Sequence, residues 1–312
     1  MKIFSVLKEW LFYGHIWIAL GAAGLGWMSL VLSSPVDMIR PSGVVDEIPW
    51  LLFFSTLGVY TLHRMISYRR ASVIPETKRY ALVKRHFYLS LAIGLSSIAL
   101  AAYLLLEYLP RLWPTLLIAA VLTAFYLVPP LPGWRRLRDI PYLKVVWVAA
   151  AWTIMTHDVP LRMVQGHFIG VCGGTFAEVN TSAINIREYI CRFAFVLAVA
   201  LLFDLRDIKL DKLHGIKTVA NSHPKLLQII VPLLLLVCSV LGFANTVVMP
   251  YPISYAITLA ASYLLCIPVA LLTFNFQEED WYAIAVNGLL LFPVVFCLAW
   301  HYFSHSLIIN IY

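Results

Sequence analysis

Three aspartates lie close together in the segment FDLRDIKLDKLHGIKTVANSHP, residues 203–224. Asp204, Asp207 and Asp211 are spaced by three and four residues, so a helix would carry all three on one face. Carboxylates at this spacing repel one another, and the negative end of a helix disfavours them further. A divalent cation would reverse both effects, and Mg²⁺ prefers carboxylate oxygens together with substrate phosphates. The spacing therefore predicts a Mg²⁺ site that binds a phosphorylated substrate.

A solvated cytoplasmic loop is the alternative interpretation of this segment. Lysines and arginines alternate with the aspartates, and in a loop they would pair with them. The one-face spacing favours the metal site, in which nearby basic residues such as Arg206 and Lys217 would hold the remaining phosphate charge. We expect the helix that carries the aspartates to continue to His214 and to stop at Gly215.

The composition shows what kind of protein must position these side chains. Of the 312 residues, 61% are hydrophobic and 12% are charged, and the mean hydropathy is +0.83. Soluble domains carry about 25% charged residues, so the composition excludes a soluble globule, a disordered chain and a secreted disulfide scaffold. The net charge of +7 fits basic residues on cytoplasmic membrane loops rather than a surface for nucleic acid.

Nine apolar stretches are candidates for helices that cross a bilayer. Because lipid requires every backbone group to be paired, and the stretches do not alternate as barrel strands do, we predict an all-α polytopic bundle forming one domain over residues 1–312. On this arrangement 18 of the 23 Lys and Arg lie on the side of the N-terminus. This split predicts a cytoplasmic N-terminus and an outward C-terminus. We expect the membrane to be a bacterial inner membrane. The predicted spans are 11–33, 48–66, 87–106, 112–131, 142–157, 189–204, 226–245, 252–274 and 281–303.

The segment Asp207-Ile-Lys-Leu-Asp211, followed by Gly215-Ile-Lys-Thr218, resembles the second aspartate-rich motif of the UbiA superfamily of intramembrane prenyltransferases. That motif is a DxxxD pattern with a GIKT-like tail, and Asp204 fits the acidic or Asn position that often precedes it. The stretch from Tyr126-Leu-Val-Pro through Arg135-Arg136 to Ile140-Pro-Tyr-Leu-Lys144 is similar to the basic fourth–fifth connection of the family. The nine predicted spans agree with its nine-helix bundle.

The resemblance implies transfer of a polyprenyl group from its diphosphate to an aromatic or other lipophilic acceptor. In the family, Mg²⁺ ions on two aspartate-rich motifs clamp the diphosphate and stabilise the charge on the leaving group. Carried over to this sequence, the metal ligands are Asp204, Asp207 and Asp211, and the catalytic residues are Asp207, Asp211 and Lys217. The implied ligands of the diphosphate are His63, Arg64, Arg136, Arg138, Lys144 and Arg206.

The first aspartate-rich motif of the family is missing from the cytoplasmic end of the second predicted span. No Asp or Glu occurs between Glu47 and Glu76, and Tyr60, His63 and Arg64 stand where carboxylates are expected. Arg64 could contact the diphosphate in place of a metal, the chain could bind a prenyl lipid without catalysis, or the substrates could differ. Anchoring of His63 and Arg64 at the membrane interface is the structural alternative.

Two other membrane-protein classes fit less well. Transporters usually carry polar residues near mid-span, and the sequence places few ionisable residues there. A CDP-alcohol phosphotransferase would show a DG…AR spacing that is absent. The acidic residues 278–280, in the last short connection, are expected to form a solvated turn. Aromatic residues that could line an isoprenoid groove, or simply pack the bundle, are Tyr60, Tyr126, Trp147 and Trp152.

Overall fold

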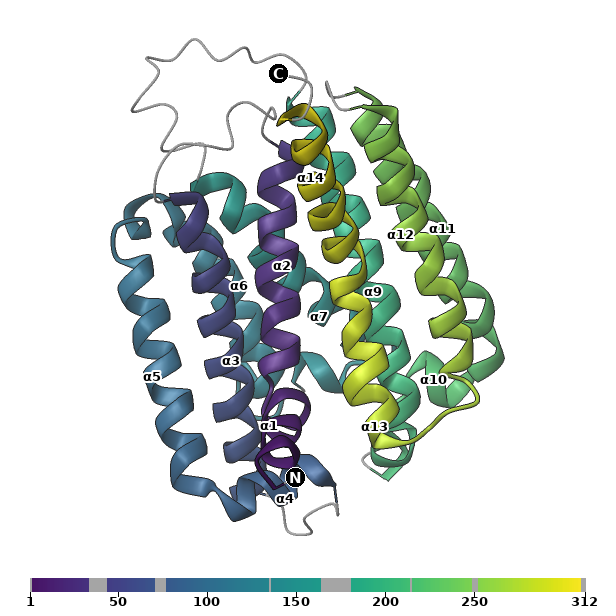
Figure 1. The fold of residues 1–312 in the computed structure, drawn as a ribbon. Helices are drawn as coiled ribbons and strands as arrows, with labels where there is room; N and C mark the ends of the chain where they lie inside the picture. Colours follow the sequence, from purple (N-terminus) through teal and green to yellow (C-terminus); the bar gives the residue numbers. More distant parts are fainter. Residues whose placement is uncertain are drawn as a thin grey trace.

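A computed structural model describes residues 2–33, 44–70, 77–134, 136–163, 181–213, 215–248 and 252–309 (Figure 1). Within these ranges the chain forms helices and turns and no strand, which confirms the all-α prediction. The elements are α1 (Lys2–Tyr13), α2 (Ile16–Ser33), α3 (Val44–Arg70), α4 (Lys78–Arg85), α5 (Phe87–Leu105), α6 (Leu109–Leu127), η2 (Leu137–Asp139), α7 (Lys144–Thr153), η3 (Ile154–Asp158), α9 (Thr181–Leu213), α10 (Val219–Ser222), α11 (Pro224–Val248), α12 (Ile253–Leu272), α13 (Glu279–Trp281), η4 (Tyr282–Val286), η5 (Leu289–Leu291) and α14 (Phe292–Ile309).

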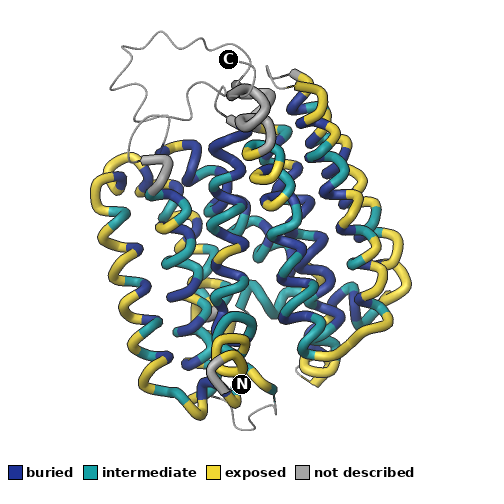
Figure 2. Tube along the Cα trace, viewed as in Figure 1, coloured by how far each residue is buried: buried dark blue, intermediate teal, exposed yellow. Residues whose placement is uncertain are grey.

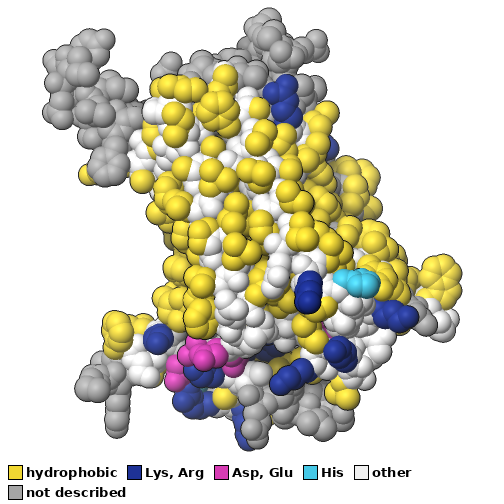
Figure 3. Space-filling view, turned by 90° about the vertical axis from the view of Figure 1, so that its right-hand side faces the viewer, with side chains coloured by type: hydrophobic (Ala, Val, Ile, Leu, Met, Phe, Trp, Pro, Cys, Tyr) yellow, Lys and Arg dark blue, Asp and Glu magenta, His cyan; other side chains and the backbone are white. Residues whose placement is uncertain are grey.

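Several helices are long and apolar enough to cross a membrane. There are five of these in the described residues, and α1 with α2 makes a sixth if the bent pair counts as one span. Figure 3 shows a broad apolar belt on one face, with most of the charged side chains of that face gathered near one end. These features are compatible with a multi-pass membrane protein. The five helices are Phe87–Leu105, Leu109–Tyr126, Pro224–Val247, Ile253–Leu272 and Glu279–Tyr302.

The remaining predicted spans are helical but more polar or shorter. Spans 48–66, 142–157 and 189–204 fall in α3, α7 with η3, and α9, none of which meets the length, hydropathy and charge of a spanning helix. α9 has 33 residues and is therefore about 50 Å long. It carries ionisable residues that turn into the bundle instead of toward lipid, and these lower its hydropathy.

The buried residues Glu188 and Arg192 show this for the first half of α9. The Arg192 guanidinium donates to Ser29 Oγ at 2.9 Å and lies 3.7 Å from Glu188 Oε1. Pairing of this kind is what allows charged groups to be buried. The first half of α9, which begins eight residues before the predicted span, therefore buries a charged pair inside the bundle.

The helices pack side by side around α2 and α9 (Figure 1). α3 packs on α5, and α11 packs on both α9 and α12. Figure 2 shows buried residues along the facing sides of the central helices, whereas α5, α11 and α12 carry exposed residues on their outer sides. The largest buried side chains of the core include Leu25 and Met28 of α2 and Phe195 of α9.

The predicted first span, 11–33, is broken at Gly14 and His15. α1 and α2 meet there at 56°. His15 adopts a positive φ of 68°, and a Cβ on Gly14 would lie 2.4 Å from the Trp10 carbonyl oxygen, so the tight turn requires glycine. The break turns α1 away from the axis of α2 and leaves the His15 side chain buried at the corner.

Three short helices lie at the end of the bundle where the chain begins. α4, α10 and α13 are all found at this end (Figure 1). α4 belongs to the second–third connection and α10 to the sixth–seventh. The Tyr142 N–H at the end of the fourth–fifth connection donates to the Lys217 carbonyl at 2.9 Å, so the three predicted basic connections lie at one end of the molecule. The candidate site lies near the same end.

Candidate functional site

A cavity of about 190 Å³ opens between the ends of the central helices. Its wall combines six charged side chains with aromatic, polar and aliphatic ones. They come from α1, α2, α3, α4, α6, α7 and α9, from the α1–α2 corner and from Asn287 between η4 and η5. The lining residues are Phe12, His15, Ile18, Tyr60, Arg64, Arg79, Tyr126, Lys144, Val145, Val148, Ala200, Phe203, Asp204, Arg206, Asp207 and Asn287.

The three aspartates lie on one face of α9, as their spacing predicts, and all face Lys144 at the start of α7. The Lys144 Nζ lies 3.0 Å from Asp204 Oδ1, 2.9 Å from Asp211 Oδ2 and 3.8 Å from Asp207 Oδ2. Lys144, Asp204 and Asp211 are buried. Asp204 and Asp207 line the cavity, whereas Asp211 lies behind Lys144 and is absent from the lining.

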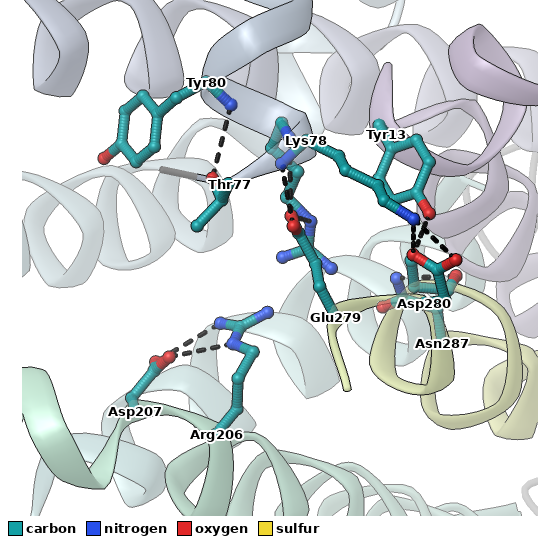
Figure 4. Close-up of polar contacts among 11 residues, drawn as sticks. Tyr13, Thr77, Lys78, Tyr80, Arg206, Asp207, Glu279, Asp280 and Asn287 are labelled. Atoms are coloured by element: carbon teal, nitrogen blue, oxygen red, sulfur yellow. Dashed lines mark hydrogen bonds and ion pairs between the residues drawn. The ribbon is translucent and has the colours of Figure 1, made fainter. Parts of the chain in front are cut away.

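Asp207 is also paired with its neighbour Arg206. The Arg206 guanidinium donates to both carboxylate oxygens, at 2.8 and 3.3 Å (Figure 4). It also lies over the Phe203 ring, 4.9 Å from the ring centroid, which is cation–π geometry. These contacts fix the guanidinium at the cavity wall.

Buried N–H groups without a partner among the described residues surround the cavity. They are Arg64 Nε, Arg79 Nη2 and Arg206 Nη1, and both ring nitrogens of the buried His15 also lack a hydrogen-bond partner there. A buried guanidinium with an unmade hydrogen bond is costly, so such a group marks a place where an acceptor would be stabilising. Four cationic side chains and two carboxylates line the cavity, which leaves a surplus of positive charge. The arrangement can bind an anion.

Arg79 reaches the cavity from α4, whose position depends on residues about 200 positions away. Thr77 caps the helix by accepting from the Tyr80 N–H at 3.4 Å. Glu279 accepts from the Lys78 backbone N–H at 2.7 Å and lies 3.8 Å from Arg79 Nε (Figure 4). The acidic turn 278–280 is thus more than the expected solvated turn, because it fixes α4.

A second contact strengthens this attachment. The Lys78 ammonium donates to Asp280 Oδ2 at 2.7 Å, and the Tyr13 hydroxyl donates to the same carboxylate (Figure 4). Both partners of the ion pair are exposed, so its contribution to stability is about 0–1 kcal/mol. It joins α1, α4 and α13.

Burial lowers the pKa of Arg79 to about 9, and repulsion from Arg206 and Arg64 contributes. The guanidinium therefore stays charged at neutral pH, although it is held among other cations. A bound anion would relieve both effects, because it would neutralise the repulsion and accept the free N–H group.

Several predicted diphosphate ligands lie outside the cavity lining. Arg136 pairs with Asp139 at 2.7 and 3.0 Å, and Arg138 lies over the Tyr126 ring at 5.8 Å. The Lys217 side chain is exposed, and His63 is half-buried beside the cavity. Of the predicted set, Arg64, Lys144 and Arg206 reach the cavity.

The GIKT tail forms the turn that follows α9. α9 ends at Leu213, His214 lies outside the described residues, and Gly215 has a φ of 67°, which confirms glycine as the stop signal. Thr218 and Asn221 then form a capping box for α10, with hydrogen bonds of 3.2 and 3.0 Å. The structure thus gives this tail a turn-forming and capping role.

The apolar part of the cavity includes two of the aromatic candidates. Tyr60 and Tyr126 line it, and the Trp152 indole donates to the Tyr60 hydroxyl at 3.1 Å. Trp147 is not in the lining. Sequence reasoning missed Arg79, His15 and Asn287, although the Thr77 cap followed by the basic stretch Lys78–Arg85 could have indicated a short amphipathic helix.

The carboxylates do not fit a Mg²⁺ ion without rearrangement. Mg²⁺ requires oxygens at about 2.0–2.1 Å in octahedral geometry, whereas here the Lys144 ammonium stands between them at hydrogen-bonding distance. Within the described residues no group of three or more His, Cys, Asp or Glu is arranged to hold a metal. Mg²⁺ binding stays a prediction, and it would first require Lys144 to move.

No protein-family model matches this chain, no curated protein matches it, and no solved structure matches it.

Proposed function

We propose that this protein binds the diphosphate group of a polyprenyl diphosphate in the cavity and transfers the prenyl group to an aromatic or other lipophilic acceptor. The observation that carries the proposal is the set of buried guanidinium N–H groups of Arg64, Arg79 and Arg206 beside apolar side chains in a membrane-type bundle. Planar guanidinium groups suit phosphate oxygens, and an apolar wall suits a prenyl chain. The similarity of residues 204–218 to a UbiA motif supports the same assignment.

Prenyl transfer requires the protein to stabilise the negative charge that develops on the departing diphosphate. The C–O bond of the allylic diphosphate breaks, and its electron pair stays on the diphosphate. The acceptor carbon then bonds to the allylic carbon and loses a proton to solvent or to the released diphosphate. Fixed cations at the departing oxygens lower this barrier because they need no reorganisation when the charge develops. Tyr60, Tyr126 and Phe203 present aromatic groups that can stabilise the allylic cation.

The proposal includes a nine-helix UbiA-type bundle in a bacterial inner membrane. In this topology α3, α7 with η3, and α9 cross the membrane with their charged residues turned inward, which adds three spans to the six formed by the apolar helices. The N-terminus and the site face the cytoplasm, and the C-terminus faces outward. The gathering of basic connections at one end of the bundle supports this orientation.

A binding and transfer experiment tests the proposal. Purified protein in lipid nanodiscs is titrated with labelled farnesyl diphosphate, and pyrophosphate release is followed with a panel of phenolic and quinol acceptors. Replacement of Arg64 by methionine should weaken binding about tenfold or more, because it removes a charge-assisted hydrogen bond. Arg69→Met is the matched control, since Arg69 is on the same helix but exposed. Equal binding by wild type and Arg64→Met, or none by wild type, would refute the proposal.

A non-catalytic prenyl-lipid-binding protein on the same fold is the second candidate. The observation that favours it is the absence of Asp or Glu between Glu47 and Glu76, where a first aspartate-rich motif would lie. This candidate predicts tight binding of farnesyl diphosphate with no pyrophosphate release for any acceptor. Release that depends on both an acceptor and Arg64 supports the transferase instead.

A further inference from the structure

The three aspartates of α9 are already paired with two fixed cations of the chain, Lys144 and Arg206. The Lys144 ammonium lies at 3.0 and 2.9 Å from Asp204 and Asp211, and the Arg206 guanidinium binds both oxygens of Asp207. Lys144 side-chain exposure is 9%, and that of Asp204 and Asp211 is 4% and 3%. Charges this deeply buried remain ionised only when they are paired, so the ammonium and the carboxylates depend on one another.

The position of Lys144 explains why three carboxylates can share one face of α9. Their mutual repulsion requires a cation between them, and the ammonium supplies it from the start of α7. An ammonium has three donors, and two of them are used by Asp204 and Asp211. Lys144 also lines the cavity, so its third N–H remains for a ligand there or for Asp207 at 3.8 Å.

Arginines that line the cavity supply direct donors for an anion. Arg64 Nε and Arg79 Nη2 are buried with no partner among the described residues, and Arg206 has one such N–H besides its bonds to Asp207. A metal ion bridges carboxylates to phosphate in sites built from acids alone. Here guanidinium groups face the cavity themselves, so a phosphate group can be held without that bridge.

We propose that Lys144 takes the place of a divalent cation, so that the cavity binds a diphosphate group directly and without metal. The identity of the ligand rests on the proposed function, whereas the replacement of the metal rests on the Lys144 contacts. Asp204 and Asp211 are then positioning residues for Lys144, and Asp207 is one for Arg206.

Metal dependence of binding tests this inference. The full chain in nanodiscs is titrated with farnesyl diphosphate in excess EDTA and again in Mg²⁺, and Mn²⁺ binding without lipid ligand is measured by electron paramagnetic resonance. For wild type we expect affinities within about twofold in the two buffers, which is less than 0.5 kcal/mol, and no bound Mn²⁺. Lys144→Ala leaves Asp204 and Asp211 without their cation, while Asp207 keeps its bonds to Arg206. The affinity of this variant for farnesyl diphosphate should fall about tenfold or more in EDTA and recover in Mg²⁺, and the variant should bind Mn²⁺.

The matched control is Lys209→Ala, which removes an exposed lysine from α9 and should behave as wild type. The inference is overturned if wild type binds farnesyl diphosphate only in Mg²⁺, or if wild type binds Mn²⁺. These two measurements use wild type alone, so they test the inference even if Lys144→Ala does not fold. Lys144→Gln keeps an amide donor in the same place and serves as the second variant. If farnesyl diphosphate binds under no condition, the proposed function fails. In that case, Mn²⁺ binding by the Lys144 variants but not by wild type would still support the replacement of the metal by Lys144.

Discussion

Replacement of Arg79 by methionine should weaken anion binding and, at the same time, stabilise the unliganded protein. Methionine keeps an unbranched apolar stem of similar reach but removes the guanidinium. The lost hydrogen bond to a charged group is worth about 1.5–3 kcal/mol, or about 10- to 150-fold in the affinity for farnesyl diphosphate.

The gain in stability comes from the surroundings of the guanidinium. Its pKa is lowered to about 9, first by burial and then by Arg206 and Arg64, so the charged form is disfavoured in the unliganded protein. The full shift from 12.5 corresponds to an upper limit of about 5 kcal/mol. Screening and relaxation reduce this, and we expect about 1 kcal/mol, or about 2 °C in melting temperature. Glu279 stays hydrogen-bonded because it also accepts from the Lys78 N–H at 2.7 Å.

The assay measures both quantities on the same nanodisc samples, binding by titration and unfolding by intrinsic fluorescence. Lys84→Met is the matched control, because Lys84 is an exposed residue of the same helix. A lower melting temperature together with weaker binding would mean that Arg79 acts by holding α4 in place. Unchanged affinity would refute its role as a ligand of the anion.

The remaining predictions concern pH and packing. The affinity for farnesyl diphosphate should be constant between about pH 7.5 and 8.5 and fall above about pH 9. The reason is that only protonated Arg79 binds the anion, and the pKa of Arg79 in the free protein is lowered to about 9. Titrations of Arg79→Met should lack this fall. Gly58→Ala should destabilise the protein by about 1–3 kcal/mol, since its Cβ would lie 2.8 Å from Ile98 Cδ1 and 3.1 Å from the Ile98 backbone nitrogen. In the same thermal assay Gly288→Ala is the control, because its Cβ meets nothing closer than 3.6 Å, and equal melting temperatures for the two variants would contradict the packing argument.

The helices could be predicted because lipid leaves the backbone few alternatives. Apolar runs must be helical or form a barrel, and every predicted span overlaps one or more helices of the structure. The common face of Asp204, Asp207 and Asp211 could also be predicted, since it follows from helical geometry alone, and their distances to Lys144 confirm it.

The rest depended on contacts between distant parts of the chain. Arg79 belongs to the cavity because Glu279 and Asp280 fix α4, and no local pattern relates residues about 200 positions apart. The break at His15 is not indicated by a proline in the sequence, and His15 adopts a positive φ of 68° there. Likewise, the mean hydropathy of α9 does not indicate how much of this helix is buried, because its charged residues pair with one another inside the bundle.

The placement of Lys144 changes what the aspartate spacing means. Three carboxylates on one helix face require a cation, but the sequence pattern does not specify whether that cation is an ion or a side chain. A lysine at the start of a neighbouring helix satisfies the same electrostatic requirement, and it is always present, whatever the Mg²⁺ concentration. The missing carboxylates near Tyr60 and His63 point in the same direction. Among the described residues that line the cavity, Asp204 and Asp207 of α9 are the only carboxylates, so a second metal would have none beside Arg64, which provides a positive charge at that place directly. Both departures from an aspartate-rich metal site thus share one physical explanation, the replacement of ions by side-chain cations.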